Sequence, residues 1–250
     1  MSIGYKMKKQ NDIAIKLSNI SKKYILHHQK PTLVENIFKF GQREEFWALK
    51  NINLEIKKGQ SLGIVGNNGS GKTTLLKIIS GISTPTSGKI GVNGRIVSLI
   101  DVNSGFNPEL TGEENIFLNG MLLGMSKKEI NKQFNKIIRF SGLKNFIDTP
   151  FYTYSFGMKI RLGFSIAIYS KPDILLIDEI LGGGDKNFLE KTLRVVQNFL
   201  KERKTLIFVS HLLPHFTKFC QRAIILEKGQ IKMIGEAKAV VNKYNPPSML

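Results

Sequence analysis

The chain contains almost no cysteine and no long hydrophobic run. Among its 250 residues Cys220 is the only cysteine, which excludes an internal disulfide and any metal site that needs several thiolates. No run approaches the roughly 18 apolar residues that a helix needs to cross a bilayer. The first residues are basic but lack the apolar core and the cleavage site of a secretory signal, so we expect the chain to stay in the cytosol.

Acidic residues are scarce as well. Lys and Arg number 37 and Asp and Glu number 19, which gives a formal net charge of +18. Such an excess attracts nucleic acids and anionic lipid headgroups alike. The lysines are scattered along the sequence, and no helix-turn-helix signal, zinc-ligand spacing or aromatic RNA platform accompanies them. The charge therefore favours a membrane surface, or plain solubility, over a nucleic-acid partner.

Residues 66–74 form a phosphate-binding loop of the pattern G-x-x-x-x-G-K-[ST], called the phosphate loop below. Its members are Gly66, Asn67, Asn68, Gly69, Ser70, Gly71, Lys72, Thr73 and Thr74. We expect a buried strand before it, at 61–65, and after it a helix whose N-terminus directs free amides at phosphates. Lys72 is expected to reach the β- and γ-phosphates, and the Thr73 hydroxyl to complete a Mg²⁺ shell. The chain is therefore predicted to bind ATP or a related nucleotide with Mg²⁺, since a chance glycine-rich turn would not explain both flanks.

Two later strand runs end in polar residues that suit phosphate chemistry. The run at 174–177 is followed by Asp178, expected to hold Mg²⁺ through water, and by Glu179, expected to orient the attacking water. An acidic helix cap is the alternative, and the phosphate loop upstream makes it the weaker one. The run at 205–209 is followed by His211, which is predicted to contact the γ-phosphate.

The remaining patterns predict an α/β fold. Apolar residues alternate at 13–17 and 52–56, which indicates two half-buried strands, and an amphipathic helix at 186–202 between two strand runs indicates a parallel βαβ unit. Hairpins are expected over Asn93-Gly94 and over Lys228-Gly229. The spacings Thr111-x-x-Glu114 and Ser126-x-x-Glu129 are capping boxes that open helices. We expect one domain over 1–250, with an α/β core at 12–109 and 169–235, an N-terminal antiparallel β part, a helical subdomain at 110–168, an insertion at 25–45 and a short tail at 236–250.

The stretch from Tyr154 to Leu162 reads Tyr-Ser-Phe-Gly-Met-Lys-Ile-Arg-Leu. Together with the phosphate loop, Asp178-Glu179, Gly184-Asp185 and His211 in this order, it resembles the ATP-binding subunits of ABC transporters. Ser155, Gly157 and Met158 stand where that family has the serine, second glycine and glutamine of its LSGGQ signature, while Phe156 replaces the first glycine. The resemblance implies a P-loop NTPase (RecA-like) core, a dimer-contacting loop at Asp185, and Asp101 as the nearest polar residue to the position of the family's glutamine loop, on the metal side of the site.

Further segments narrow the resemblance. Residues 45–54, residues 104–116 and the Tyr-Ser-x-Gly-Met form of the signature are similar to the O-antigen, capsule and teichoic-acid exporters, which move lipid-linked polysaccharides out of the bacterial cytoplasm. The resemblance implies a head-to-tail homodimer that holds ATP between Lys72 of one copy and Ser155 of the other. It also implies a separate integral-membrane permease docked near 101–125, at the cytoplasmic face of the inner membrane. The chain is similar to the short form of this branch, without the C-terminal carbohydrate-binding domain that some members carry.

Several alternatives stay open. Tyr24 matches best the aromatic residue that stacks on adenine in this family, with Trp47 as the second candidate. The insertion at 25–45 contains Thr32-x-x-Glu35, which suggests a short capped helix that faces a partner or the membrane, or else a surface excursion without a role. A soluble ABC-type ATPase acting on nucleic acid or ribosomes is the competing function, and a small-molecule kinase is a third.

Overall fold

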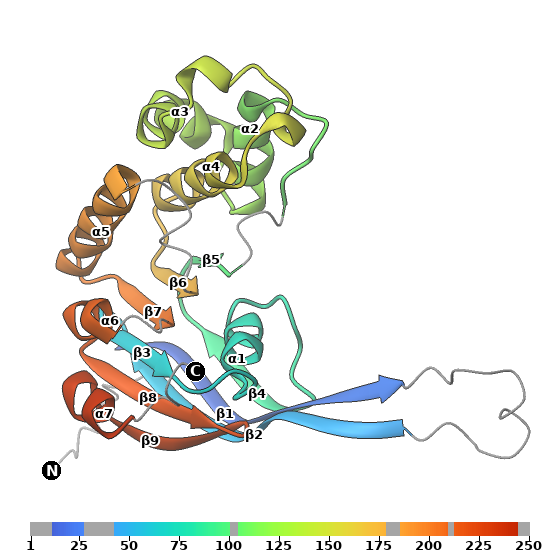
Figure 1. Cartoon of the computed structure of the whole chain (residues 1–250), viewed down its shortest axis with the longest axis vertical. Helices are drawn as coiled ribbons and strands as arrows, with labels where there is room; N and C mark the ends of the chain where they lie inside the picture. Colours follow the sequence, from blue (N-terminus) through green and yellow to red (C-terminus); the bar gives the residue numbers. More distant parts are fainter. Residues whose placement is uncertain (1–11, 28–42, 101–104, 179–185, 210–212, 245–250) are drawn as a thin grey trace, which may run out of the picture.

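The computed structural model describes residues 12–27, 43–100, 105–178, 186–209 and 213–244. Within these ranges the chain forms two sheets, helices packed around them, and a separate group of helices at one end (Figure 1). The strands are β1 (Ile13–His27), β2 (Arg43–Lys57), β3 (Ser61–Val65), β4 (Ser87–Val92), β5 (Ile96–Leu99), β6 (Ile174–Asp178), β7 (Thr205–Val209), β8 (Arg222–Glu227) and β9 (Gln230–Glu236). The helices are α1 (Lys72–Ile79), α2 (Gly112–Leu122), α3 (Lys127–Ser141), α4 (Phe156–Tyr169), α5 (Lys186–Lys201), α6 (Leu213–Phe219) and α7 (Ala237–Lys243), with short 3₁₀ turns η3 (Lys144–Phe146) and η4 (Phe151–Thr153).

A small antiparallel sheet opens the chain. Among the described strands its order is β2-β1-β4, and Ile15 and Leu17 of β1 pair with Ile56 and Leu54 of β2. These four side chains are buried, so the expected half-buried strands are confirmed. Both strands are longer than the alternating segments alone indicate, and they run into both ends of the 25–45 insertion, whose central residues 28–42 lie outside the described ranges.

The second sheet carries the nucleotide motifs. Its order in the described structure is β5-β6-β7-β3-β8-β9, parallel except for β9, which pairs antiparallel with β8. Every residue of β3 and of β7 is buried, because one face of the sheet packs on the antiparallel sheet and α1 while α4 to α7 cover the other. The parallel βαβ unit of β6, α5 and β7 and the hairpin over Lys228-Gly229 are therefore both confirmed.

The hairpin expected over Asn93-Gly94 is wrong. The strands on either side belong to different sheets, since β4 pairs with β1 and β5 pairs with β6. The Asn93 amide and side chain donate to the carbonyl oxygens of Ala14 and Ile13, which fastens the turn to the start of β1. Gly94 has a φ of +128° and lies against Asp173, where a Cβ would come within 2.8 Å of the aspartate Cβ. Asn-Gly thus connects two sheets here, and only Gly94 of the pair has a positive φ, whereas the type I′ turn of a hairpin requires it at both residues.

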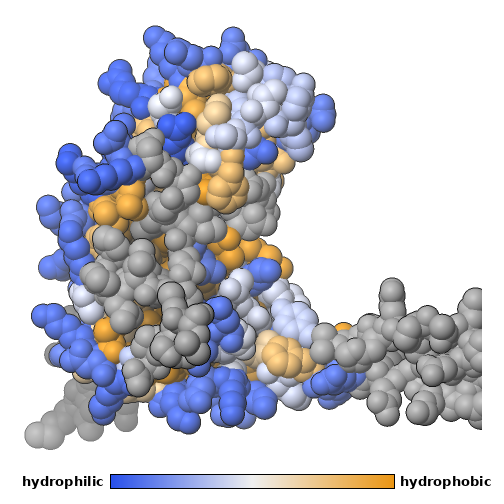
Figure 2. All heavy atoms as spheres, in the orientation of Figure 1, coloured by the Kyte–Doolittle hydropathy of each residue, from blue (hydrophilic) through white to orange (hydrophobic). Residues whose placement is uncertain are grey.

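Helices α2, α3 and α4 form a helical subdomain at the upper end of the molecule in Figure 1. It has a hydrophobic core of its own, with Ile116, Ile130, Ile137 and Leu162 among its buried members. Both predicted capping boxes are confirmed, at the start of α2 and of α3. In the same view hydrophilic side chains cover the upper and left-hand edges of the molecule, over α3 and α5, and hydrophobic ones gather farther in (Figure 2). No helix among the described residues combines the length and the apolar character that spanning a membrane requires.

Candidate nucleotide-binding site

The phosphate loop connects β3 to α1 at the edge of the sheet where the parallel strands end. Gly66, Gly69 and Gly71 have positive φ values, and Gly71 is the N-cap residue of α1. A Cβ on Gly71 would come 2.5 Å from the carbonyl oxygen of Ala48, and a Cβ on Gly66 would overlap the carbonyl oxygen of Leu226. Strands β2 and β8 thus press on the loop from behind, so only glycine fits at these two positions.

Lys72 extends back over the loop. Its Nζ donates to the carbonyl oxygens of Gly66, at 2.6 Å, and Asn67, at 3.0 Å. The residue is only 9% exposed, so the ammonium group is held inside the loop rather than directed into solvent. Phosphate oxygens suit this ammonium group as acceptors, because hydrogen bonds to charged acceptors are stronger than those to neutral carbonyl oxygens.

Two further features of the loop suit an anion. Ser70 is 4% exposed, and its Oγ has no hydrogen-bond partner among the described residues, which is uncommon for a buried hydroxyl. The N-cap of α1 is a glycine that supplies no side-chain oxygen to the first-turn amides. The loop therefore suits the phosphates of ATP, because the first-turn amides of α1, the Ser70 hydroxyl and the Lys72 ammonium group come together where phosphate oxygens would bind.

Thr73 and Asp178 meet across the site. The Thr73 hydroxyl donates to Asp178 Oδ2 at 3.4 Å, although the two residues are 105 positions apart in sequence. Thr73 comes from the first turn of α1 and Asp178 from the last position of β6. A hydroxyl and a carboxylate side by side next to a phosphate site are ligands that Mg²⁺ accepts, usually together with water and phosphate oxygens.

Four of the predicted site residues lie outside the described ranges. They are Asp101, Glu179, Asp185 and His211. Their neighbours are described, since β6 ends at Asp178 and β7 ends at Val209, one and two residues before the predicted base and histidine. The roles of all four remain predictions from the sequence.

The signature residues begin α4. Ser155 is the N-cap, and its Oγ accepts a hydrogen bond from the Met158 amide at 3.3 Å. The preceding Tyr154 is buried and its hydroxyl donates to the Phe146 carbonyl oxygen at 2.5 Å, which anchors the segment in the helical subdomain. Phe156, in place of the family's first glycine, is 63% exposed. Figure 1 shows α4, whose N-cap is Ser155, in the helical subdomain, and α1, which begins at Lys72, beside the sheets.

The two candidates for adenine stacking lie on opposite faces of the β1–β2 ribbon. Tyr24 pairs with Phe46, and the adjacent Lys23 pairs with Trp47, so successive pairs point to opposite sides. Tyr24 is 39% exposed and Trp47 38%, and a lysine ammonium stands over each ring, Lys22 over Tyr24 and Lys23 over Trp47. Trp47 directly precedes Ala48, which contacts Gly71. Neither candidate is eliminated by this arrangement.

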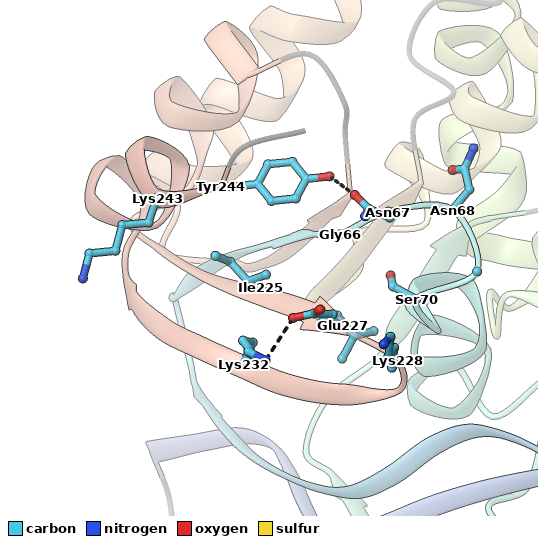
Figure 3. A pocket seen from close by; sticks show the side chains of 12 residues that line it. Gly66, Asn67, Asn68, Ser70, Ile225, Glu227, Lys228, Lys232, Lys243 and Tyr244 are labelled. Carbon is cyan, nitrogen blue, oxygen red and sulfur yellow. Dashed lines mark hydrogen bonds and ion pairs between the residues drawn. The ribbon is translucent and has the colours of Figure 1, made fainter. Parts of the chain in front are cut away.

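A contact that the sequence did not indicate joins the phosphate loop to the end of α7. Beside the loop is a cavity of about 520 Å³, lined by Gly66 to Ser70, by the β8–β9 hairpin, and by Lys243 and Tyr244. Tyr244 points across it, while Lys243 points away (Figure 3). The Tyr244 hydroxyl donates to Asn67 Oδ1 at 3.2 Å, and burial raises the pKa of Tyr244, so the phenol stays protonated and able to donate. The expected tail at 236–250 therefore includes a helix and a residue that touches the site.

Comparison with known proteins agrees with this geometry. The family model described as ABC transporter matches residues 49–182, a range that contains the phosphate loop, the signature segment and Asp178. The O-antigen export system ATP-binding protein RfbB of Klebsiella pneumoniae is 36% identical over 237 residues, which cover 92% of this chain and 96% of that protein. The RfbB protein of Myxococcus xanthus is 46% identical over 79% of this chain, but the chain spans only 45% of that protein's length. The teichoic acids export ATP-binding protein TagH of Listeria innocua is 40% identical, over 94% of this chain and 70% of its own.

A solved structure shares the fold. A dimeric ATP-binding cassette in a post-hydrolysis state, bound to ADP and Pi, superimposes with a TM-score of 0.72 at 25% identity. The match covers 89% of this chain and 98% of that one. The α/β fold with an antiparallel sheet and a parallel sheet is thus the fold of that cassette.

Proposed function

Because this chain belongs to the ABC transporter family, we propose that it is the ATP-binding and ATP-hydrolysing subunit of a polysaccharide exporter. One observation carries the nucleotide half of this proposal. Lys72 is held inside the phosphate loop, next to an uncapped helix N-terminus and an unpartnered buried hydroxyl on Ser70. Such an arrangement of donors and positive charge favours the binding of an anion such as phosphate.

The roles of the site residues follow from their places. Lys72 and the loop amides would hold the β- and γ-phosphates, and Thr73 with Asp178 would hold Mg²⁺. When bound, MgATP would supply the phosphoanhydride bond whose hydrolysis drives transport. Glu179 would orient the attacking water, and His211 would contact the γ-phosphate; both assignments rest on the sequence.

The site of a single copy is incomplete, and a second copy would complete it. Ser155 and Gly157 at the start of α4 would close over the nucleotide held by the other copy, with Asp185 in the contact between them. The dimeric state of the solved cassette supports this arrangement. The pair would work under a separate permease, docked near 101–125, at the cytoplasmic face of the inner membrane.

The cargo of the complex would be a lipid-linked polysaccharide. Relatives named for O-antigen export and for teichoic acids export support this class, and they give no support to action on nucleic acid or ribosomes. Because both names occur among the relatives, the proposed cargo is a class of lipid-linked polymers rather than one particular glycan.

The nucleotide half is tested with two variants. Glu179→Gln should leave ATP binding intact, reduce turnover by two orders of magnitude or more, and accumulate an ATP-bound dimer, because water orientation is lost while the phosphate cradle remains. Lys72→Ala should instead weaken ATP binding itself. Nucleotide titration, phosphate release and size-exclusion chromatography measure the three quantities. Wild-type turnover in Glu179→Gln would remove Glu179 from its role.

The transport half is tested by purifying the chain from detergent-solubilised membranes and identifying what accompanies it. Recovery of a multi-span permease in a fixed ratio, with ATPase activity, supports the exporter. Recovery with ribosomes or RNA instead, and turnover stimulated by them, would replace it with the nucleic-acid function.

A further inference from the structure

Helix α3 has one strongly basic face. Its buried residues are Ile130, Gln133, Ile137 and Ser141. At 100° per residue, four exposed cationic side chains on the opposite face lie within about 80° of one another, with the exposed and neutral Asn135 beside them. We call the four cations the α3 stripe: Lys128, Lys132, Lys136 and Arg139.

The stripe is not neutralised within the described part of the chain. None of its four cations takes part in an ion pair there. The one acidic residue of α3, Glu129, uses its carboxylate in the capping box with Ser126, accepting from the serine amide and hydroxyl. Lys128, Lys132 and Lys136 follow one another at i, i+4 spacing, where like charges repel and weaken the helix. An external anion would relieve this repulsion.

The α3 stripe lies on the helix at the end of the molecule farthest from the antiparallel sheet (Figure 1). Helix α3 packs on α4, and α4 lies between it and the sheets, so α3 stands at the upper end in Figure 1. Figure 2 shows hydrophilic side chains along that edge. Helix α2, which lies within the proposed permease contact at 101–125, packs against α3 in the same core. The stripe therefore lies on the outer side of the same subdomain that contains part of the proposed permease contact.

We propose that the α3 stripe docks on anionic phospholipid headgroups of the leaflet in which the permease sits, an inference that rests on the proposed function. Three of the four cations are lysines, which act as mobile, hydrated point charges and lack the planar fork that recognises a single phosphate. No aromatic side chain lies on the stripe, so it offers no platform for stacked bases. Since the apolar side of α3 is buried in the protein, attachment is electrostatic and reversible.

Vesicle sedimentation tests the proposal with the purified full chain. The probes are vesicles of phosphatidylcholine alone and vesicles containing phosphatidylglycerol, at about 0.1 M salt. The stripe variant is Lys128→Gln, Lys132→Gln, Lys136→Gln and Arg139→Gln. Each headgroup-facing cation contributes about fivefold to partitioning, so the stripe variant should bind anionic vesicles at least tenfold more weakly than wild type.

The chain offers a matched control. Lys191, Arg194 and Lys201 of α5 and Lys238 of α7 are also exposed, and they have the same composition of three lysines and one arginine. Changing these four residues to Gln removes the same net charge from α5 and α7, outside the stripe. This control variant should change the affinity for anionic vesicles less than threefold. Circular dichroism should show that the stripe variant is folded, with a melting temperature no lower than that of wild type, because repulsion within α3 has been removed.

The outcomes separate the inference from the proposed function. If the stripe variant binds anionic vesicles as tightly as wild type, the inference is overturned. If both quadruple variants lose vesicle binding equally, the inference is also overturned, and net charge alone explains the binding. Tighter binding to single-stranded RNA than to anionic vesicles, lost in the stripe variant, overturns it in favour of nucleic acid. ATP turnover of the stripe variant in detergent should equal that of wild type. An absence of turnover in the wild-type protein would instead count against the proposed function.

Discussion

The phosphate loop supplies two backbone oxygen atoms that accept hydrogen bonds from the ammonium group of Lys72. The carbonyl oxygens of Gly66 and Asn67 fix the side chain in one place, so little rotamer freedom remains to be lost on binding. The loop itself is fixed from behind, because the amide of Gly229 donates to the Ser70 carbonyl oxygen at 3.0 Å. Preorganisation of this kind makes the loop sensitive to contacts that hold Asn67.

Tyr244 is such a contact, and we expect Tyr244→Phe to weaken ATP binding. The variant keeps the ring and removes the hydrogen bond to Asn67 Oδ1, which lies at the protein surface. Loss of an exposed hydrogen bond costs about 0.5 kcal/mol, so the dissociation constant for ATP should rise about twofold. Turnover at saturating ATP should stay unchanged, because Tyr244 touches no group that reacts. Titration with a fluorescent nucleotide measures the first quantity and phosphate release the second; unaltered affinity would show that Tyr244 only packs.

The strand before the phosphate loop and the helix after it were predicted from the sequence and are confirmed, whereas the contact of Tyr244 was not predicted, and the difference has a physical reason. The loop is encoded by neighbouring residues, whose glycines and lysine have a geometry that local pattern determines. Tyr244 reaches Asn67 across 177 positions, and a polar tail carries no periodicity that would indicate such a contact. The hairpin prediction at Asn93-Gly94 failed for another reason, because an Asn-Gly pair indicates a turn but does not determine which strands the turn connects.

The start of β5 joins the helical subdomain to the parallel sheet. Arg95 donates through Nη1 to the Ser170 carbonyl oxygen at the end of α4 and through Nη2 to the Gly124 carbonyl oxygen just after α2, each at 2.8 Å. Its backbone exchanges hydrogen bonds with Asp173, at the start of β6. One guanidinium group thus satisfies unpaired carbonyls at the C-terminal ends of two helices, where positive charge is favourable.

We expect Arg95→Ala to loosen this joint. Two charge-assisted, partly exposed hydrogen bonds are lost, so the free energy of unfolding should fall by about 1–3 kcal/mol. Hydrogen exchange should accelerate at the ends of α2 and α4 more than within the sheet. Arg95→Lys should recover part of the loss, since an ammonium group reaches one carbonyl. Arg194→Ala, an exposed arginine on α5 with a long 3.9 Å ion pair, is the control and should change little. Uniform acceleration across the sheet would contradict a local joint.

The capping box of α3 predicts a pH dependence at the start of that helix. The pKa of Glu129 is lowered, chiefly by the hydrogen bond from the Ser126 amide and then by that from its hydroxyl. Because the folded-state pKa lies below the ordinary glutamate value of 4.5, the stabilisation is present above that value and is lost as the pH falls through the lowered pKa. The Ser126 amide resonance should therefore titrate at acid pH. In Glu129→Gln it should not, since the amide oxygen still accepts but does not ionise; identical titrations in both proteins would exclude the box as the cause.

On the scale of the whole molecule, the phosphate loop and the signature segment belong to separate hydrophobic cores. Helix α1, which begins at Lys72, packs in the core between the two sheets, and Tyr154 is anchored in the core of the helical subdomain. The two halves of the candidate site are joined by the hydrogen bonds of Arg95 and by the packing of Phe164 and Ala167 of α4 against the parallel sheet. Two copies placed head to tail would bring complementary halves together twice, as a closed twofold interface requires.

Mixing two inactive variants tests this shared site. Lys72→Ala disables the loop and Ser155→Arg blocks the signature, so each homodimer has two defective sites and should show almost no turnover. In a mixed dimer, one site combines both lesions, while the other combines the intact loop of the Ser155→Arg copy with the intact signature of the Lys72→Ala copy. Since random pairing gives about half mixed dimers with one good site each, the mixture should recover up to about a quarter of wild-type activity. Phosphate release before and after mixing measures the recovery, with each variant mixed with itself as the control. If Ser155 instead served the loop of its own copy, every site would contain a lesion and mixing would restore nothing.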